Sequence, residues 1–164
     1  MKELSLYKSY GYSFMPKLAF DFVSMIEKQA GVVYQSMGLI IPVITSSTLV
    51  LIATQQKASL LEIARRLDIP HQLAAQRVKT LLKLQVISAD KDNSDKRRTN
   101  YQLTAMGQQQ HQLLLTYLQH ADKVFAALTI ELGVDLMAVL TAANSSFVER
   151  PLTSRIHQGE LHHD

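Results

Sequence analysis

Cysteine is absent from the 164-residue sequence, so the chain can form neither disulfides nor a thiol-based redox switch. Long apolar runs are absent too, because no stretch approaches the roughly 20 residues that a membrane-spanning helix needs. The first 14 residues are polar and rich in tyrosine, which does not fit a secretory signal peptide. These absences predict a cytoplasmic protein without a membrane partner.

The sequence also lacks the short motifs that mark common enzyme classes: no glycine-rich phosphate loop, no HExxH and no GxSxG. His111 and His120 are nine residues apart and therefore face opposite sides of one helix. The tail histidines, with Glu160 and Asp164 nearby, could bind a transition metal, but no His-x-x-x-His pattern supports a site and a polar tail explains them as well. We therefore expect no enzyme activity, no cofactor and no metal site.

Two features of the composition are informative, namely the hydrophobic content and the distribution of charge along the chain. Its 47% hydrophobic residues are enough for a sizeable core, and its length fits one domain with extra helices. The net charge of +3 is unevenly distributed, since residues 65–98 carry nine Lys or Arg against four Asp and the rest carries eight basic against ten acidic residues. A basic module on a near-neutral scaffold is typical of nucleic-acid binding.

The segment from Ser59 to Leu103 reads as two short helices followed by a β-hairpin. Ser59 and Glu62 form a capping-box pattern at the start of the first helix. Pro70 ends that helix, because proline disfavours helical geometry in the residue before it, and it suits the first turn of the next helix. This order of elements predicts a winged helix-turn-helix, a module that places its second helix in the major groove of DNA.

The second helix, expected from about His71 to Leu84, has two different faces. Its spacing predicts one buried stripe, made of Ala74, Val78, Leu81 and Leu82. The opposite side carries candidate DNA contacts, namely Gln72, Gln76, Lys79 and Lys83, with Arg77 and Thr80 on the flank. Glutamine can bind adenine, arginine guanine and lysine a phosphate. An ordinary solvated helix face would show the same pattern.

The hairpin favours the DNA-binding interpretation. Residues 86–89 and 99–103 read as its two strands, with β-branched and aromatic content. The tip between them contains Asn93-Ser94-Asp95, which is turn chemistry, followed by three cations, Lys96, Arg97 and Arg98. A charged tip can be a solvated loop, but after a helix-turn-helix it predicts contacts to phosphates or the minor groove.

These residues resemble the MarR family of bacterial transcription regulators. The resemblance rests on the runs EIARRL, LKLQVI and NSDKRRTNYQLTAMG, and its motifs lie between about Glu62 and Gly107. In that family the wing arginine enters the minor groove and an aspartate helps to hold it, which implies these roles for Arg97 and Asp95. The resemblance further implies a homodimer and a small-molecule effector, often aromatic or anionic, that binds between the DNA-binding region and the dimer helices.

The sequence departs from the family pattern at several positions. Pro70 stands where a serine commonly caps the recognition helix, and Gln85 stands where a glycine usually precedes the first wing strand. Arg77 occupies a position that is often apolar, whereas Gln76 and Thr80 replace frequent arginines. These differences bear on which DNA sequence the chain would prefer.

Amphipathic helices flank the winged region on both sides. A helix from about Pro16 to Gly38 carries the apolar set Phe22, Ile26, Ala30, Val33 and Met37. A second helix starts at Thr104 and carries Leu114, Leu118, Ala121, Phe125 and Leu128, a heptad-like spacing. A last amphipathic helix is expected over residues 136–147, and residues 152–164 read as a mostly polar tail. The stripes fit a dimer interface, although an intramolecular bundle would show them too.

The expected fold class is mainly α with a small β-hairpin wing. We divide the chain into an N-terminal arm and dimerisation helix (1–38), a winged helix-turn-helix region (39–103), and C-terminal dimerisation helices with a polar tail (104–164). The expected function is that of a homodimeric regulator of transcription that binds a pseudo-palindromic operator in double-stranded DNA, as a ligand-responsive repressor. The alternative is a winged-helix protein-interaction module without specific DNA binding.

Overall fold

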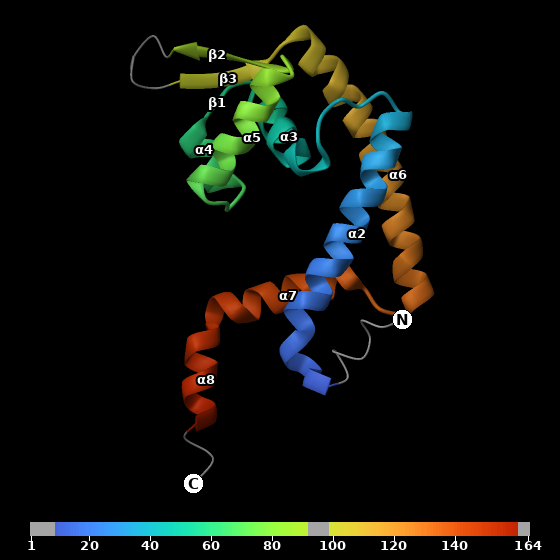
Figure 1. The fold of residues 1–164 in the computed structure, drawn as a ribbon, viewed down its shortest axis with the longest axis vertical. Helices are drawn as coiled ribbons and strands as arrows, with labels where there is room; N and C mark the ends of the chain where they lie inside the picture. The colour runs from blue at the N-terminus through green and yellow to red at the C-terminus, as the bar shows by residue number, and fades with distance from the viewer. Residues whose placement is uncertain (1–8, 92–98, 161–164) are drawn as a thin grey trace. The chain divides into compact units, whose positions relative to one another are not determined.

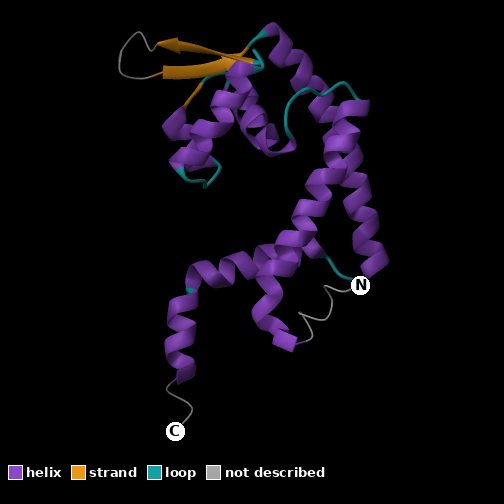
Figure 2. Ribbon diagram, in the orientation of Figure 1, coloured by secondary structure: helices purple, strands orange, loops and turns teal. Residues whose placement is uncertain are grey.

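The structure is a computed structural model that describes residues 9–91 and 99–160. The chain divides into two compact units, Met1–Leu118 and Gln119–Asp164. The helices are η1 (Gly11–Phe14), α2 (Met15–Ser36), η2 (Val43–Thr45), α3 (Ser46–Gln55), α4 (Leu60–Arg66), α5 (His71–Lys83), α6 (Ala105–Leu132), α7 (Leu136–Glu149) and α8 (Leu152–Glu160). The strands are β1 (Ala58–Ser59), β2 (Ile87–Lys91) and β3 (Thr99–Leu103) (Figures 1 and 2).

The predicted helix-turn-helix is present as α4 and α5. The Ser59 Oγ accepts a hydrogen bond from the Glu62 N–H, and the Ser59 N–H donates to the Glu62 carboxylate at 2.8 Å. This reciprocal pair is the capping box that the sequence predicted. Pro70 is the N-cap of α5 and supplies no side-chain hydrogen bond there.

Helices α2, α4 and α5 each have a residue in the left-handed region two positions after their last helical residue. These residues are Gly38 (φ +78°), Asp68 (φ +50°) and Gln85 (φ +57°). At Gln85, the Gln85 N–H donates to the Leu82 carbonyl and the Val86 N–H donates to the Leu81 carbonyl, which is a Schellman motif. Gln85 therefore adopts the conformation that a glycine would favour at the end of the recognition helix.

The wing is part of a three-stranded antiparallel sheet in the order β1-β3-β2. Ile87 pairs with Leu103 and Lys91 with Thr99, and the short strand β1 pairs Ser59 with Asn100. The first wing strand begins one residue later and ends two residues later than the expected 86–89, because Val86 still closes the end of α5. Helices α3, α4 and α5 contact this sheet (Figure 1).

The core of the first unit joins the helix-turn-helix, the sheet and the first turns of α6. Its largest fully buried apolar side chains are Leu49, Ile52, Ile63, Leu81, Val86 and Leu114. Leu39 and Ile41, from the connector between α2 and η2, are also buried in this cluster. The predicted stripe of α5 is confirmed, since Ala74, Val78 and Leu81 are buried and Leu82 packs against them.

Helix α6 begins in close contact with the end of the recognition helix. The Thr104 Oγ accepts a hydrogen bond from the Gly107 N–H and donates one to the Gln85 carbonyl, so Thr104 caps the helix as predicted. A Cβ added to Gly107 would lie 1.8 Å from the Val86 carbonyl oxygen. Only glycine allows α6 to approach the backbone this closely.

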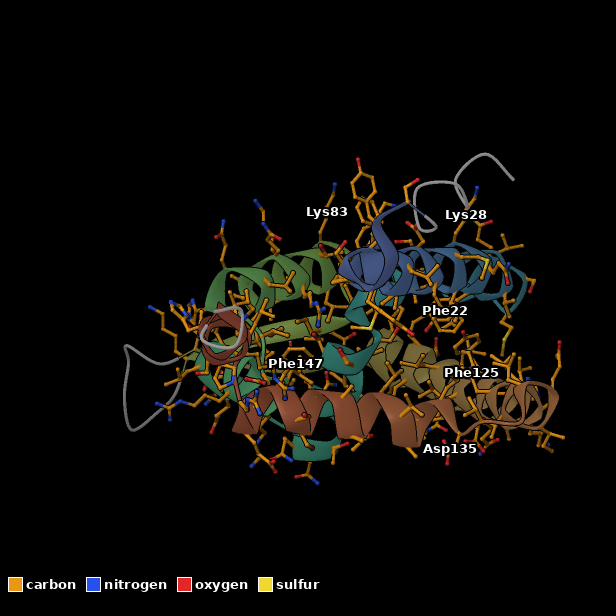
Figure 3. All side chains as sticks on the ribbon, turned by 90° about the horizontal axis from the view of Figure 1, so that it is seen from below. Phe22, Lys28, Lys83, Phe125, Asp135 and Phe147 are labelled. Carbon is orange, nitrogen blue, oxygen red and sulfur yellow. The ribbon has the colours of Figure 1, made fainter. Side chains whose placement is uncertain are left out.

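The second unit contains the remainder of α6 together with α7 and α8. Gly133 (φ +66°) separates α6 from α7. Asp135 lies just before α7 (Figure 3), and its carboxylate caps this helix by accepting a hydrogen bond from the Ala138 N–H at 3.0 Å. No single helix of the described residues is both long and apolar enough to cross a membrane, while α6 and α7 taken together, bent by 88° at their break, pass that test by length and composition.

The segment described as a mostly polar tail over residues 152–164 is helical from Leu152 to Glu160, which forms α8, and the sequence did not predict this helix. Arg155 explains much of this helix, because its guanidinium donates hydrogen bonds to the Ser146 and Arg150 carbonyls and lies 4.8 Å from the centre of the Phe147 ring. These contacts come from α7 and the turn that follows it. The composition of residues 152–164 alone could not predict these contacts, because the partners of Arg155 lie outside that segment.

Gly107→Ala should destabilise the protein by about 2 kcal/mol or more, because the new methyl group would push α6 away from Val86. Urea unfolding followed by circular dichroism measures this change. Gly31→Ala is the matched control, since a Cβ at Gly31 in α2 meets nothing within 4 Å, and alanine should stabilise that helix by up to about 1 kcal/mol. Equal unfolding midpoints for wild type and Gly107→Ala would contradict the close approach.

Candidate nucleic-acid interface

The outward face of α5 carries the polar side chains that the sequence singled out. Gln72, Gln76, Lys79 and Lys83 are all exposed, one to three turns apart along 13 residues. Lys83, at the end of the helix, extends away from the ribbon (Figure 3). The opposite face of α5 is buried in the core. The exposed row of glutamine amides and lysine charges is therefore accessible to an extended ligand such as a groove of DNA.

Arg77 does not join the outward row. Its Nη1 donates a hydrogen bond to the Ser47 Oγ of α3 at 3.3 Å. Its Nε is buried and has no hydrogen-bond partner among the described residues. The structure therefore directs Arg77 toward α3, whereas the sequence-based expectation made it a base-reading residue.

Thr80 lies on the flank of the same helix and is half-buried. Its hydroxyl donates to the Gln76 carbonyl at 3.0 Å. The hydroxyl oxygen keeps its acceptor capacity, so Thr80 could accept a hydrogen bond from a base but has its own donor engaged within the helix. This internal bond narrows what Thr80 can recognise.

The wing lies next to α5 in the chain and is anchored at a defined register. Among the described residues, strands β2 and β3 pair as far as Lys91 and Thr99. Lys57, after α3, forms an exposed ion pair with Asp90 of β2 at 3.5 Å. The tip residues Asp95, Lys96, Arg97 and Arg98 lie outside the described residues, so their roles stay predictions.

A groove lies on the inner side of Arg77. It has a volume of about 680 Å³ and is lined by residues of α2, η2, α3 and α5 together with Leu118: Val23, Ile26, Glu27, Val43, Ile44, Ser46, Ser47, Val50, Arg77 and Leu118. The lining is mainly apolar, and its charged members are Glu27 and Arg77. The volume is in the range of small-molecule sites.

Sequence reasoning missed this groove. The apolar connector Leu39–Pro42 does not line it, since Leu39 and Ile41 are buried in the core. One signal was available, namely an arginine at a helix position that is often apolar in the resembling family. Arg77 at such a position could have indicated a polar feature on the inner side of α5.

The described residues contain no group of three or more His, Cys, Asp or Glu side chains that could hold a metal ion. His111 is partly buried, and that burial lowers the pKa of its imidazole. A lone histidine of this kind does not define a site.

Comparison with known proteins gives a consistent answer on the fold. No protein-family model matches the sequence, and no curated protein matches it. Solved structures do match. FabT from Streptococcus pneumoniae in complex with DNA is 14% identical with a TM-score of 0.64, and the match covers 84% of this chain and 97% of FabT.

Two further solved structures extend this result. A MarR family transcription regulator is 12% identical with a TM-score of 0.62, over 91% of this chain and 96% of that one. The heme sensor protein PefR from Streptococcus agalactiae, in complex with heme, is 15% identical with a TM-score of 0.58, over 84% and 95% of the two chains. The architecture, the order of the elements and these matches agree, and the chain has the winged helix-turn-helix fold of the MarR-family transcription regulators.

Proposed function

We propose that this chain is a homodimeric, sequence-specific DNA-binding transcription regulator that acts as a ligand-responsive repressor. The outward face of α5 is the observation that carries the proposal. It presents Gln72 and Gln76 for base edges and Lys79 and Lys83 for phosphates, all exposed. The wing cations, with Arg97 foremost, would add contacts to the minor groove. FabT, which shares the fold, is itself bound to DNA in its structure.

The dimer part of the proposal is supported by the apolar surface of the long helices. In α2, Leu18, Phe20, Val23 and Val32 are each more than half exposed. In the second unit, Ile130, Met137 and Val148 are exposed by 82%, 74% and 81%. Exposed apolar surface of this extent is typical of a protein interaction site and not of the solvent-exposed surface of a monomer. A second copy would also supply the second recognition helix that an operator with two half-sites about one DNA turn apart requires.

Selection from a random duplex DNA library tests the proposal as a whole. We expect the pure protein to enrich one pseudo-palindromic sequence and to bind it at least about 10³-fold more tightly than random DNA at one fixed salt concentration. Sedimentation of the same sample should give twice the 18.4 kDa chain mass. Salt-dependent binding without sequence preference, or no DNA binding at all, would instead favour the protein-interaction module.

The phosphate contacts of α5 have their own test. Lys83→Ala should lower the slope of log K against log salt concentration by about 0.9, because one released counterion is lost with one phosphate contact. Lys28→Ala is the matched control, since Lys28 is also exposed but lies on α2 (Figure 3). If both variants change the slope equally, general charge attraction explains the binding and the α5 assignment is wrong.

The proposed wing contact has a parallel test. Arg97→Ala should lower the slope of log K against log salt concentration as Lys83→Ala does.

The groove beside Arg77 supports the ligand-responsive part of the proposal. A guanidinium with a buried, unpaired Nε is costly, and an anion is its natural partner. The other lining residues are mainly apolar. The best-fitting effector is therefore a small anion with an apolar body. Because Arg77 belongs to α5, such a ligand would bind to the recognition helix itself and favour one of its positions. PefR, another protein with this fold, is bound to heme in its structure.

Benzoate is a suitable probe of this groove, since it combines one carboxylate with one apolar ring. Saturating benzoate should weaken operator binding of the wild type by about tenfold, a typical coupling between two sites. Arg77→Leu should bind the operator but lose the response to benzoate. Arg66→Leu, which removes an exposed arginine from α4, should keep the response. An equal response in all three proteins would exclude Arg77 as the anchor.

A further inference from the structure

Gln110 is a buried polar side chain that joins two parts of the chain far apart in sequence. Only 7% of it is exposed. Its Oε1 accepts a hydrogen bond from the Ile40 N–H at 2.8 Å, and its Nε2 donates one to the Gly38 carbonyl at 3.1 Å. Both partners are backbone groups just beyond the end of α2. One side chain of α6 therefore provides hydrogen-bond partners for a backbone donor and a backbone acceptor of the connector after α2.

The same side of α6 makes two other contacts that matter for α5 and α2. Gly107, three residues before Gln110, lies against the Val86 carbonyl at the end of α5. Tyr117, seven residues after Gln110, places its ring edge-on to Tyr34 of α2, with 4.7 Å between the ring centres. These contacts fall within roughly 15 Å along the helix axis. Helix α6 is thus the common support of the recognition helix and of α2.

Tyr34 adds a second link on the α2 side. Its hydroxyl and the Ser46 Oγ share a hydrogen bond of 2.8 Å, and Tyr34 is buried. Burial raises the pKa of the Tyr34 hydroxyl above its ordinary value, so the group stays protonated and the bond persists at physiological pH. The contact between the Tyr34 and Tyr117 rings is not directional in the way that the two hydrogen bonds of Gln110 are, so Gln110 defines the register more narrowly.

An apolar side chain at position 110 would fill the same space without paying the desolvation cost of an amide. A buried polar residue in such a place is best explained by specificity, because it selects one arrangement among several that would pack equally well. Leucine or methionine would allow the connector after α2 to shift along α6. Glutamine does not, since any shift leaves the Ile40 N–H or the Gly38 carbonyl unpaired.

We propose that Gln110 is a positioning residue for DNA binding, which holds α2 at one angle to the recognition helix through α6. The proposal rests on the proposed function, in which α2 belongs to the dimer interface. The angle would then set the spacing of the two copies of α5. A rotation of about 10° on a lever of about 20 Å displaces α5 by about 3.5 Å, one base-pair step of the operator.

Gln110→Leu tests the proposal, with Gln109→Leu as the matched control. Both changes are chemically identical and sit on neighbouring positions of α6, but Gln109 is exposed. Gln110→Leu should lower the ratio of operator affinity to random-DNA affinity by about tenfold or more, because misplaced recognition helices lose base contacts and keep phosphate contacts. Gln109→Leu should leave the ratio unchanged. An unchanged ratio in Gln110→Leu, or an equal loss of both affinities, overturns the proposal.

A second measurement works without DNA and separates this proposal from the proposed function. The chain has no cysteine, so Lys28→Cys and Lys83→Cys introduce the only two sites for spin labels, one on α2 and one on α5. With labelled chains diluted into unlabelled ones, the distance distribution within one chain should be narrow in the wild-type and Gln109→Leu backgrounds. It should broaden in the Gln110→Leu background. Equal widths overturn the positioning role even if operator binding is confirmed.

A wild type that fails to prefer any operator would refute the proposed function, while the widths of the spin-label distance distributions would still decide the role of Gln110.

If Gln110→Leu does not fold, Gln110→Glu takes its place, because the carboxylate still accepts a hydrogen bond from the Ile40 N–H but cannot donate one to the Gly38 carbonyl. It should broaden the distance distribution relative to the wild type. A wild-type width in Gln110→Glu would then overturn the proposal.

Discussion

The close approach of α6 to the Val86 carbonyl is the constraint on which the first unit depends. Val86 lies between the end of α5 and the start of β2, so its position sets both the recognition helix and the first wing strand. Gly107 allows the approach from α6, and Thr104 holds the neighbouring Gln85 carbonyl. The same helix then holds the end of α2 through Gln110. One short stretch of α6 thus fixes α5, the proposed DNA-binding element, and α2, which carries exposed apolar surface.

Most of the winged helix-turn-helix could be predicted from the sequence because its signals are local. The capping box of Ser59 and Glu62, the stop at Pro70 and the buried stripe of α5 each depend on residues a few positions apart. The role of Gly107 depends on Val86, 21 residues away, and that of Gln110 on a connector 70 residues away. Periodicity within one helix contains no information on such distant partners.

The residues of the candidate site also fall into those that local spacing could place and those that depend on distant contacts. Helical spacing was sufficient to place Gln72, Gln76, Lys79 and Lys83 on the outward face. Arg77 sits on the flank, where the direction of a long side chain depends on its neighbour, and Ser47 of α3 draws it inward. The helix α8 was missed for a related reason, because Arg155 reaches back to Ser146 and Phe147 in the preceding helix. Pairing of chains and the contacts of the wing tip remain predictions.

Ser59 has two structural roles at once, and they have a mechanical consequence. It is the last residue of β1, paired with Asn100 of the wing, and it is also the N-cap of α4. A force that bends the wing toward a DNA backbone would therefore pull on the first turn of α4 and strain its capping bonds. Flexing of the wing would therefore be coupled to the stability of the first turn of α4, through the Ser59 hydroxyl and the Glu62 carboxylate.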